Sequence, residues 1–247
     1  SDVCSSDLGR QKGRRRFQKL QGIFCSGPSE RSEAAGLKVK NTSTGAPAAK
    51  TLGVIAIDLD DDGFQDLVVA NDTVQNHLFH NEKNGTFKEM GGQAGLAFDS
   101  YGATRGAMGI DAAHFREDDS LGIAIGNFAN EMTALYVSQG RALAYADEAI
   151  TEGIGPASRL PLKFGVFFFD YDLDGRLDLL TCNGHLEEEI SKIQKSQTYA
   201  QPAQLFWNTG AASGATFVQV PPDKCGSDIF KRSEEHTTEL QSPYVIS

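Results

Sequence analysis

The chain has 247 residues, of which 40% are hydrophobic and 9% aromatic, so it can bury a sizeable core and is not disordered as a whole. Its formal net charge of −10 disfavours broad nucleic-acid binding and indicates that cations or basic partners meet the acidic groups. No window offers the roughly 18 uninterrupted apolar residues of a membrane span, and the first residues lack the apolar core of a secretory signal peptide.

The two ends of the chain read as translated sequencing adapter. Residues 1–8, SDVCSSDL, can be encoded by one strand of a common adapter. The complementary strand encodes a stretch that matches residues 232–242, RSEEHTTELQS, at all but one position. We therefore predict that residues 1–8 and 232–247 are adapter artefacts and exclude them from the fold. Each stretch contributes −2 to the net charge, so −6 remains for the rest of the chain.

Residues 9–32 carry a basic run, GRQKGRRRFQK, which directly follows the first artefact. We interpret this segment as an out-of-frame or chimeric stretch; the alternative is a functional basic arm. The remaining cysteines, Cys25, Cys182 and Cys225, are too far apart for a CxxC metal site or a closed disulfide framework. The interpretable domain is therefore 33–231.

A repeat organises this domain. Asn71, Asn127 and Asn183 follow one another at intervals of 56 residues, and each closes a short run of small and apolar residues. A second marker, AAGL at 34–37, AGL at 94–96 and EGI at 152–154, has almost the same period. Two markers with one period indicate duplicated units, which we place at about 38–96, 97–154 and 155–231.

Within a unit, the pattern predicts short strands separated by turn residues. The strands expected in the first unit are 53–57, 67–70, 77–81 and 85–89, and those in the third are 163–169, 177–182, 204–208 and 216–220. Four short strands in about 55–60 residues are typical of a propeller blade. The predicted fold is all-β, a fragment of about three four-stranded blades of a larger β-propeller, because closure takes at least four blades.

The third unit contains an insertion between Asn183 and Gln204. Its sequence, LEEEISKIQKSQTY, places Leu186, Ile190 and Ile193 on one face of a helix. We therefore expect a short amphipathic helix at the edge of this blade.

Two acidic loops carry the clearest chemical signal. Residues 58–66 and 170–178 each have aspartate at positions 1, 3, 5 and 9 and glycine at position 6. Carboxylates this close repel one another unless a cation neutralises them, and Ca2+ accepts about six to eight oxygen ligands in flexible geometry. The main-chain carbonyl of position 7 adds a further oxygen. The predicted ligands of two Ca2+ sites are Asp58, Asp60, Asp62, Phe64 and Asp66, and then Asp170, Asp172, Asp174, Arg176 and Asp178.

Other interpretations of these loops are weaker. An EF-hand needs flanking helices and a bidentate glutamate at position 12, where this chain has Val69 and Thr181. Mg2+ requires a stricter octahedron, and zinc is disfavoured because the loops contain neither Cys nor His. The remaining alternative is a solvated acidic turn. Asp61 has no counterpart in the second loop and is expected to face water.

The middle unit lacks the aspartate pattern. Its counterpart, 111–119, has Ala113 and Phe115 at positions 3 and 5, and it is three residues longer before its asparagine than the other two units. We expect no calcium site there.

The segments DLDDDGFQDL with VVAN and LFHN, and FGVFFFDYDLDGRLDLLTCNGH with LFWN, resemble FG-GAP/VCBS-type repeats, the blades also found in integrin α-subunit propellers. The stretches GAPAAKTLGV, FDSYGATRGAMGIDA and EAITEGIGPASRL are similar to the bacterial branch related to cartilage acidic protein, which is associated with ASPIC/UnbV. The resemblance covers roughly 33–229. It implies a seven-bladed propeller with calcium in the blade hairpins, export from the cell and no assigned catalysis.

These observations predict a calcium-binding β-propeller module, extracellular or periplasmic, in which Ca2+ rigidifies the blade hairpins. We expect an unknown protein or carbohydrate ligand in binding or adhesion, no nucleic-acid partner, and no membrane span in this fragment. The alternative is an enzyme that uses the central funnel of the complete propeller. The cluster HLEEE at His185 is not HExxH, and a GxSxG motif is absent, so we predict that the protein is not an enzyme.

Overall fold

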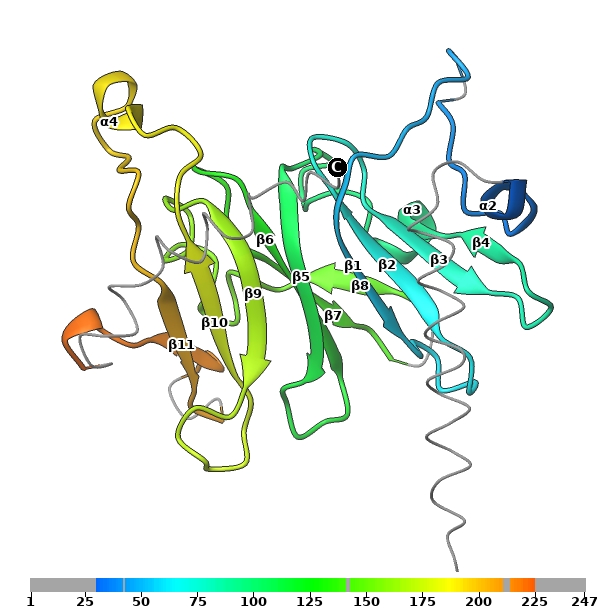
Figure 1. Ribbon diagram of the computed structural model, residues 1–247. Coiled ribbons are helices and arrows are strands. Elements are labelled where there is room, and N and C mark those ends of the chain that lie inside the picture. The colour runs from blue at the N-terminus through cyan, green and yellow to red at the C-terminus, as the bar shows by residue number, and fades with distance from the viewer. Residues whose placement is uncertain (1–29, 42, 141–142, 211–213, 225–247) are drawn as a thin grey trace, which may run out of the picture.

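Figure 1 shows the computed structural model, which describes residues 30–41, 43–140, 143–210 and 214–224. The two predicted adapter stretches, most of the segment interpreted as out of frame, and Cys25 and Cys225 lie outside the described residues. The described chain forms three four-stranded sheets, and it contains few helices. The predicted all-β fold of about three propeller blades is confirmed.

Each sheet is built from four strands that pair antiparallel with their neighbours in sequence order. Blade 1 comprises β1 (Thr51–Ile57), β2 (Asp66–Asn71), β3 (His77–Asn81) and β4 (Phe87–Glu89). Blade 2 comprises β5 (Ala107–His114), β6 (Leu121–Asn127), β7 (Ala134–Ser138) and β8 (Tyr145–Asp147). Blade 3 comprises β9 (Lys163–Phe169), β10 (Asp178–Asn183), β11 (Gln204–Asn208) and β12 (Phe217–Gln219).

The helical elements are short. They are α2 (Glu30–Ala34), α3 (Gly91–Ala94), α4 (Ile190–Ile193) and the 3-10 turn η1 (Pro222–Lys224). Within the described part of the chain, no helix has the length and apolar character needed to cross a membrane. The limits that the repeat predicts for each unit stay a prediction.

The first strands of the three blades lie next to one another, with β5 between β1 and β9 (Figure 1). A glycine at the same place in β1 and β5 permits this close approach. A Cβ on Gly53 would lie 2.4 Å from the main-chain oxygen of Met108, and one on Gly109 would lie 2.2 Å from that of Phe164. Any larger residue would therefore push the blades apart.

Strands buried on both faces contribute to the apolar clusters that join neighbouring blades. All six residues of β2 and all seven of β6 are buried, as expected for strands covered on both sides. Val68 and Leu78 of blade 1 pack with Ile123 of blade 2 in one cluster. Ala124 and Leu135, also of blade 2, pack against blade 3 in a second cluster with Leu179, Phe206 and Phe217.

The asparagine marker of the repeat has a structural cause. Asn71, Asn127 and Asn183 are each at most 1% exposed at the end of the second strand of their blade. Each side-chain amide donates a hydrogen bond to a main-chain oxygen of the segment that follows, at 2.8, 2.6 and 2.7 Å respectively. The buried asparagine thus has a partner for its amide and ties the end of its strand to the main chain that follows.

The glycine marker also reflects packing. Gly36, Gly95 and Gly153 adopt left-handed backbone angles, with φ of 74°, 81° and 88°. A Cβ on any of them would lie 2.2–2.5 Å from the main-chain oxygen of a residue in the outermost strand of the blade that follows. Each of these glycines therefore allows the segment that contains it to pack directly against the outermost strand of the blade that follows.

A short helix forms in the insertion, but the prediction that it buries one apolar face is wrong. The helix α4 has only four residues, and of its expected apolar face Ile190 is buried while Leu186 and Ile193 are 49% and 74% exposed. One turn is too short to present residues seven apart on a common face. The insertion is anchored instead by Gln197, which is 1% exposed and donates a hydrogen bond to the Leu160 oxygen at 2.9 Å.

Candidate metal centres

The two acidic loops connect the first and second strands of blades 1 and 3, and they lie at the same end of the blades (Figure 1). Each loop has two residues in the left-handed region, at positions 4 and 6. These are Asp61 and Gly63 in the first loop, with φ of 58° and 85°, and Leu173 and Gly175 in the second, with φ of 62° and 89°. Asp61 is exposed, as predicted.

The first aspartate of each loop holds the turn together. The Asp58 carboxylate accepts main-chain N–H bonds from Asp62 at 3.0 Å and from Gly63 at 2.7 Å. The second loop repeats both bonds, at 3.0 and 2.9 Å, with Asp170, Asp174 and Gly175. Negative charge on position 1 therefore stabilises the tight turn that brings positions 3 and 5 inward.

The last aspartate of each loop lies deep between strands. Asp66 and Asp178 are each 1% exposed, and burial raises the pKa of both carboxyl groups. Asp66 accepts main-chain N–H bonds from Leu59 at 3.2 Å and from Asn81 at 2.8 Å. The corresponding donors to Asp178 are the main-chain N–H groups of Tyr171 and Asn208, at 2.8 and 2.7 Å. These donors favour the ionised form and oppose the effect of burial.

Position 3 belongs to the group of possible ligands in each loop. The Oδ1 atom of Asp60 is buried and has no hydrogen-bond partner among the described residues. A buried carboxylate oxygen without a donor is costly unless a cation or water meets it. Its counterpart, Asp172, accepts a hydrogen bond from the Trp207 indole nitrogen at 2.9 Å through one oxygen.

Position 5 is paired with a basic side chain in both loops. Asp62 Oδ2 forms an ion pair with Lys83 Nζ at 2.8 Å, and this interaction lowers the pKa of Asp62. Asp174 forms an ion pair with Arg176 of its own loop. Each position 5 carboxylate therefore already has a positive charge beside it.

Two groups of side chains bring ligand atoms to within 4.8 Å of one another. In blade 1 the group is Asp60, Asp62 and His80, and in blade 3 it is Asp170, Asp172 and Asp178. The structure thus brings together two predicted ligands of the first loop and three of the second. In the first loop, Asp58 and Asp66 bind main-chain donors; the predicted roles of the Phe64 and Arg176 carbonyls stay predictions.

Sequence reasoning missed His80. This residue comes from β3, and its Nδ1 lies 3.0 Å from Asp66 Oδ1. The segments HLFHN and QLFWN align residue by residue, so His80 and Trp207 occupy the same position and each bonds to an aspartate of its own loop. That alignment was the available signal. The argument against a nitrogen ligand therefore holds for blade 3 but not for blade 1.

The middle blade fills the corresponding place with apolar side chains. Phe115 is 4% exposed, and its ring stacks on that of Phe168 with centroids 6.1 Å apart and contacts that of Phe217 at 5.3 Å. Asp111 accepts a hydrogen bond from the Phe168 main-chain nitrogen at 2.8 Å, which joins blade 2 to blade 3. Here the loop contributes to packing between blades.

His185, the residue considered for catalysis, is part of the packing of the insertion. It is 7% exposed, its ring lies 5.8 Å from the ring of Phe128, and its Nδ1 accepts the main-chain N–H of Glu187 at 3.0 Å. Burial lowers the pKa of His185. These contacts describe a structural residue.

Comparison with known families gives one match. Residues 58–125 match the family model described as FG-GAP-like repeat. The match begins at the first aspartate of the blade 1 loop and ends within β6, and it supports a β-propeller-type module. No curated protein matches the chain at a significant level.

Proposed function

We propose that this chain is a calcium-binding β-propeller module that acts outside the cytoplasm and binds a protein or carbohydrate partner. One Ca2+ ion in each acidic loop rigidifies the hairpin between the first two strands of blades 1 and 3. The proposed role is binding rather than catalysis, because His185 is engaged in packing.

The observation that carries this proposal is the repetition of one loop geometry in two blades. Both loops use position 1 to hold the turn and position 9 to anchor the base, and both place a ligand atom of position 3 within 4.8 Å of ligand atoms from two other side chains. The same hydrogen bonds recur 112 residues later in the chain, and this repetition favours a metal site over a solvated acidic turn.

The donor set fits a hard cation, because it is all oxygen in blade 3 and in blade 1 comprises two carboxylates beside one histidine nitrogen. Carboxylate and main-chain oxygens are the ligands that Ca2+ prefers, and the clustered aspartates reduce their mutual repulsion when a divalent ion is present. When bound, the ion supplies positive charge and fixes the hairpin; the chain's residues provide the oxygens and the turn. Loops of this kind suit an extracellular or periplasmic setting, where calcium is abundant.

The test is the calcium dependence of thermal unfolding. Calcium at about 100 times its Kd should stabilise the folded chain by about 2.7 kcal/mol per site. Asp60→Asn and Asp172→Asn should each remove the contribution of one site, and the double variant should melt at the same temperature in calcium and in excess chelator. Asp61→Asn is the matched control, because it removes one negative charge from the same loop at an exposed position. A wild-type melting temperature that is identical in calcium and in chelator would refute the proposal.

A further inference from the structure

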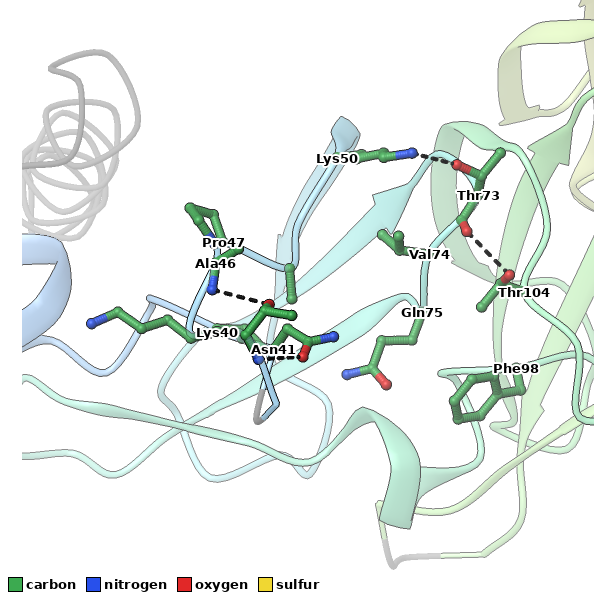
Figure 2. A pocket seen from close by; sticks show the side chains of 13 residues that line it. Lys40, Asn41, Ala46, Pro47, Lys50, Thr73, Val74, Gln75, Phe98 and Thr104 are labelled. Atoms are coloured by element: carbon green, nitrogen blue, oxygen red, sulfur yellow. Dashed lines mark hydrogen bonds between the residues drawn. The ribbon is translucent and has the colours of Figure 1, made fainter.

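A cavity of about 530 Å³ lies at the end of blade 1 opposite the acidic loop. Three segments form it: residues 39–41 and 44–50 before β1, the loop 73–75 between β2 and β3, and the connection to blade 2 at Phe98 and Thr104. Figure 2 shows the side chains that line it. Its volume lies in the range of about 300–1,000 Å³ that is common for small-molecule sites.

The lining of this cavity differs from the rest of the molecule. Although the chain carries a net charge of −10, no acidic residue is among the residues that line the cavity. The polar lining consists of lysines, threonines and two amides, and the remaining wall is apolar. The polar residues are Lys40, Asn41, Thr44, Lys50, Thr73, Gln75 and Thr104.

The rim is held in place by hydrogen bonds. Lys50 Nζ donates to Thr73 Oγ1 at 2.8 Å, and Thr104 Oγ1 donates to the Thr73 main-chain oxygen at 3.2 Å (Figure 2). Lys50 is exposed, and its ammonium group retains further N–H donors beyond this bond. Lys40 extends away from the cavity and pairs with Glu33 at 3.3 Å, so Lys50 is the cation available to a ligand.

Two amide groups and one aromatic ring are available inside this rim. Among the described residues, neither the Gln75 side chain nor the Asn41 amide nitrogen has a hydrogen-bond partner, and Figure 2 shows Gln75 between Asn41 and Phe98. Phe98 is 40% exposed, and its main-chain oxygen is fixed by a hydrogen bond from the Tyr136 hydroxyl at 3.2 Å. The Phe98 ring is therefore partly exposed, while the main chain that carries it is held in place.

We propose that this cavity binds a saccharide that carries a carboxylate, such as a hexuronic acid unit. Amides and threonine hydroxyls combine donors and acceptors and so match adjacent sugar hydroxyls. The Phe98 ring suits the C–H face of a sugar, and Lys50 pairs with the carboxylate as a point charge. A nucleic acid would require more than one available cation, because phosphates dominate its binding. This inference rests on the proposed binding role and specifies its ligand class.

Isothermal titration with a hyaluronan tetrasaccharide, which contains glucuronate, tests this inference. The wild-type chain in calcium should show saturable binding, and neutral chitotetraose should bind at least about tenfold more weakly because a charged hydrogen bond is lost. Lys50→Gln should weaken binding of the acidic sugar by about tenfold or more, and Phe98→Ala should weaken both sugars. The matched control is Lys38→Gln, since Lys38 is a neighbouring lysine that pairs with Glu33 and does not line the cavity.

Three results would overturn the inference: no binding by the wild type, equal affinity for the acidic and neutral sugars, or unchanged affinity in Lys50→Gln. An oligoglutamate peptide that binds in place of the sugar would assign the cavity to acidic peptides and would also overturn it. Asp172→Asn should leave sugar binding intact, because it lies in the opposite-end loop of blade 3. If the wild-type chain is stabilised by calcium but does not bind the sugar, only the ligand class is refuted. If it binds the sugar but is not stabilised by calcium, only the calcium sites are refuted.

Discussion

Lys163 is an unusual residue because a lysine at the start of β9 is fully buried. Its Nζ donates hydrogen bonds to the main-chain oxygens of Glu131, at 2.5 Å, and Ser158, at 2.7 Å, so one side chain ties blade 3 to two loops that precede it. Burial lowers the pKa of Lys163 from 10.5 to about 7, an effect that the nearby Glu131 opposes. A neutral amine has two N–H groups, which matches the two acceptors.

This shift predicts a pH dependence of stability. Because the pKa is lower in the folded chain than in the unfolded chain, unfolding takes up a proton between pH 7 and about 10, and stability should rise with pH across that window. The slope from one group is at most about 1.4 kcal/mol per pH unit. Below pH 7 the group is protonated in both states, so its contribution no longer changes.

Denaturant unfolding at pH 7, 8 and 9, in chelator, measures this slope. Lys163→Met should abolish the rise relative to the wild type, whatever its effect on absolute stability. Lys195→Met, at an exposed position in the insertion, serves as the control and should keep the wild-type slope. Equal slopes in the wild type and Lys163→Met would show that Lys163 does not titrate in this range.

At the scale of elements, the contact between neighbouring first strands depends on glycine. Gly109 of β5 approaches β9 so closely that an added Cβ would lie 2.2 Å from the Phe164 main-chain oxygen. A main-chain atom within a paired strand cannot yield as the end of a flexible side chain can. The shared 56-residue spacing of Gly53 and Gly109 therefore follows from one repeated contact.

Gly109→Ala should destabilise the chain by about 1–3 kcal/mol, because overpacking must displace one blade relative to the next. The midpoint of denaturant unfolding measures this effect. Gly92→Ala is the control: it lies in α3, a Cβ there would meet no atom within 4 Å, and its stability should be unchanged or slightly higher. A Gly109→Ala midpoint equal to that of the wild type would show that the blades are loosely packed.

At the scale of the whole molecule, blade 3 presents one face with exposed apolar residues. Phe167, Trp207 and Val218 are 51%, 39% and 42% exposed. The residues 56 and 112 positions before Phe167 are Asp111, which bonds across to blade 3, and Ile55, which packs against the cluster between blades 1 and 2. The repeat position that contacts a neighbouring blade in blades 1 and 2 is therefore exposed to solvent in blade 3.

This face should cause self-association that depends on concentration. Sedimentation velocity over a series of concentrations should show association of the wild-type chain, and Phe167→Ser should shift it to several-fold higher concentration, since the apolar contact area falls. Tyr101→Ser is the control, because Tyr101 is 89% exposed on a different part of the molecule. Identical profiles for Phe167→Ser and the wild type would show that the face does not mediate contacts.

The sequence alone was sufficient for the fold class and for the two acidic loops. Short apolar runs between turn residues, the 56-residue markers and the spacing of the aspartates can all be read from the sequence. Short apolar runs indicate strands, and closely spaced aspartates repel one another without a cation, so neither inference needs a distant partner. The strands expected at 77–81, 163–169 and 204–208 coincide with β3, β9 and β11 for this reason.

The tertiary structure decided which side chains surround each loop. His80 and Lys83 reach the blade 1 loop, and Trp207 reaches the blade 3 loop, only because antiparallel strand pairing brings them there from at least 14 residues away. The same holds for Ile193, which its helical pattern marked as buried but which has no blade surface to cover. Burial and charge pairing depend on what packs against a residue, and that partner lies far away in the sequence.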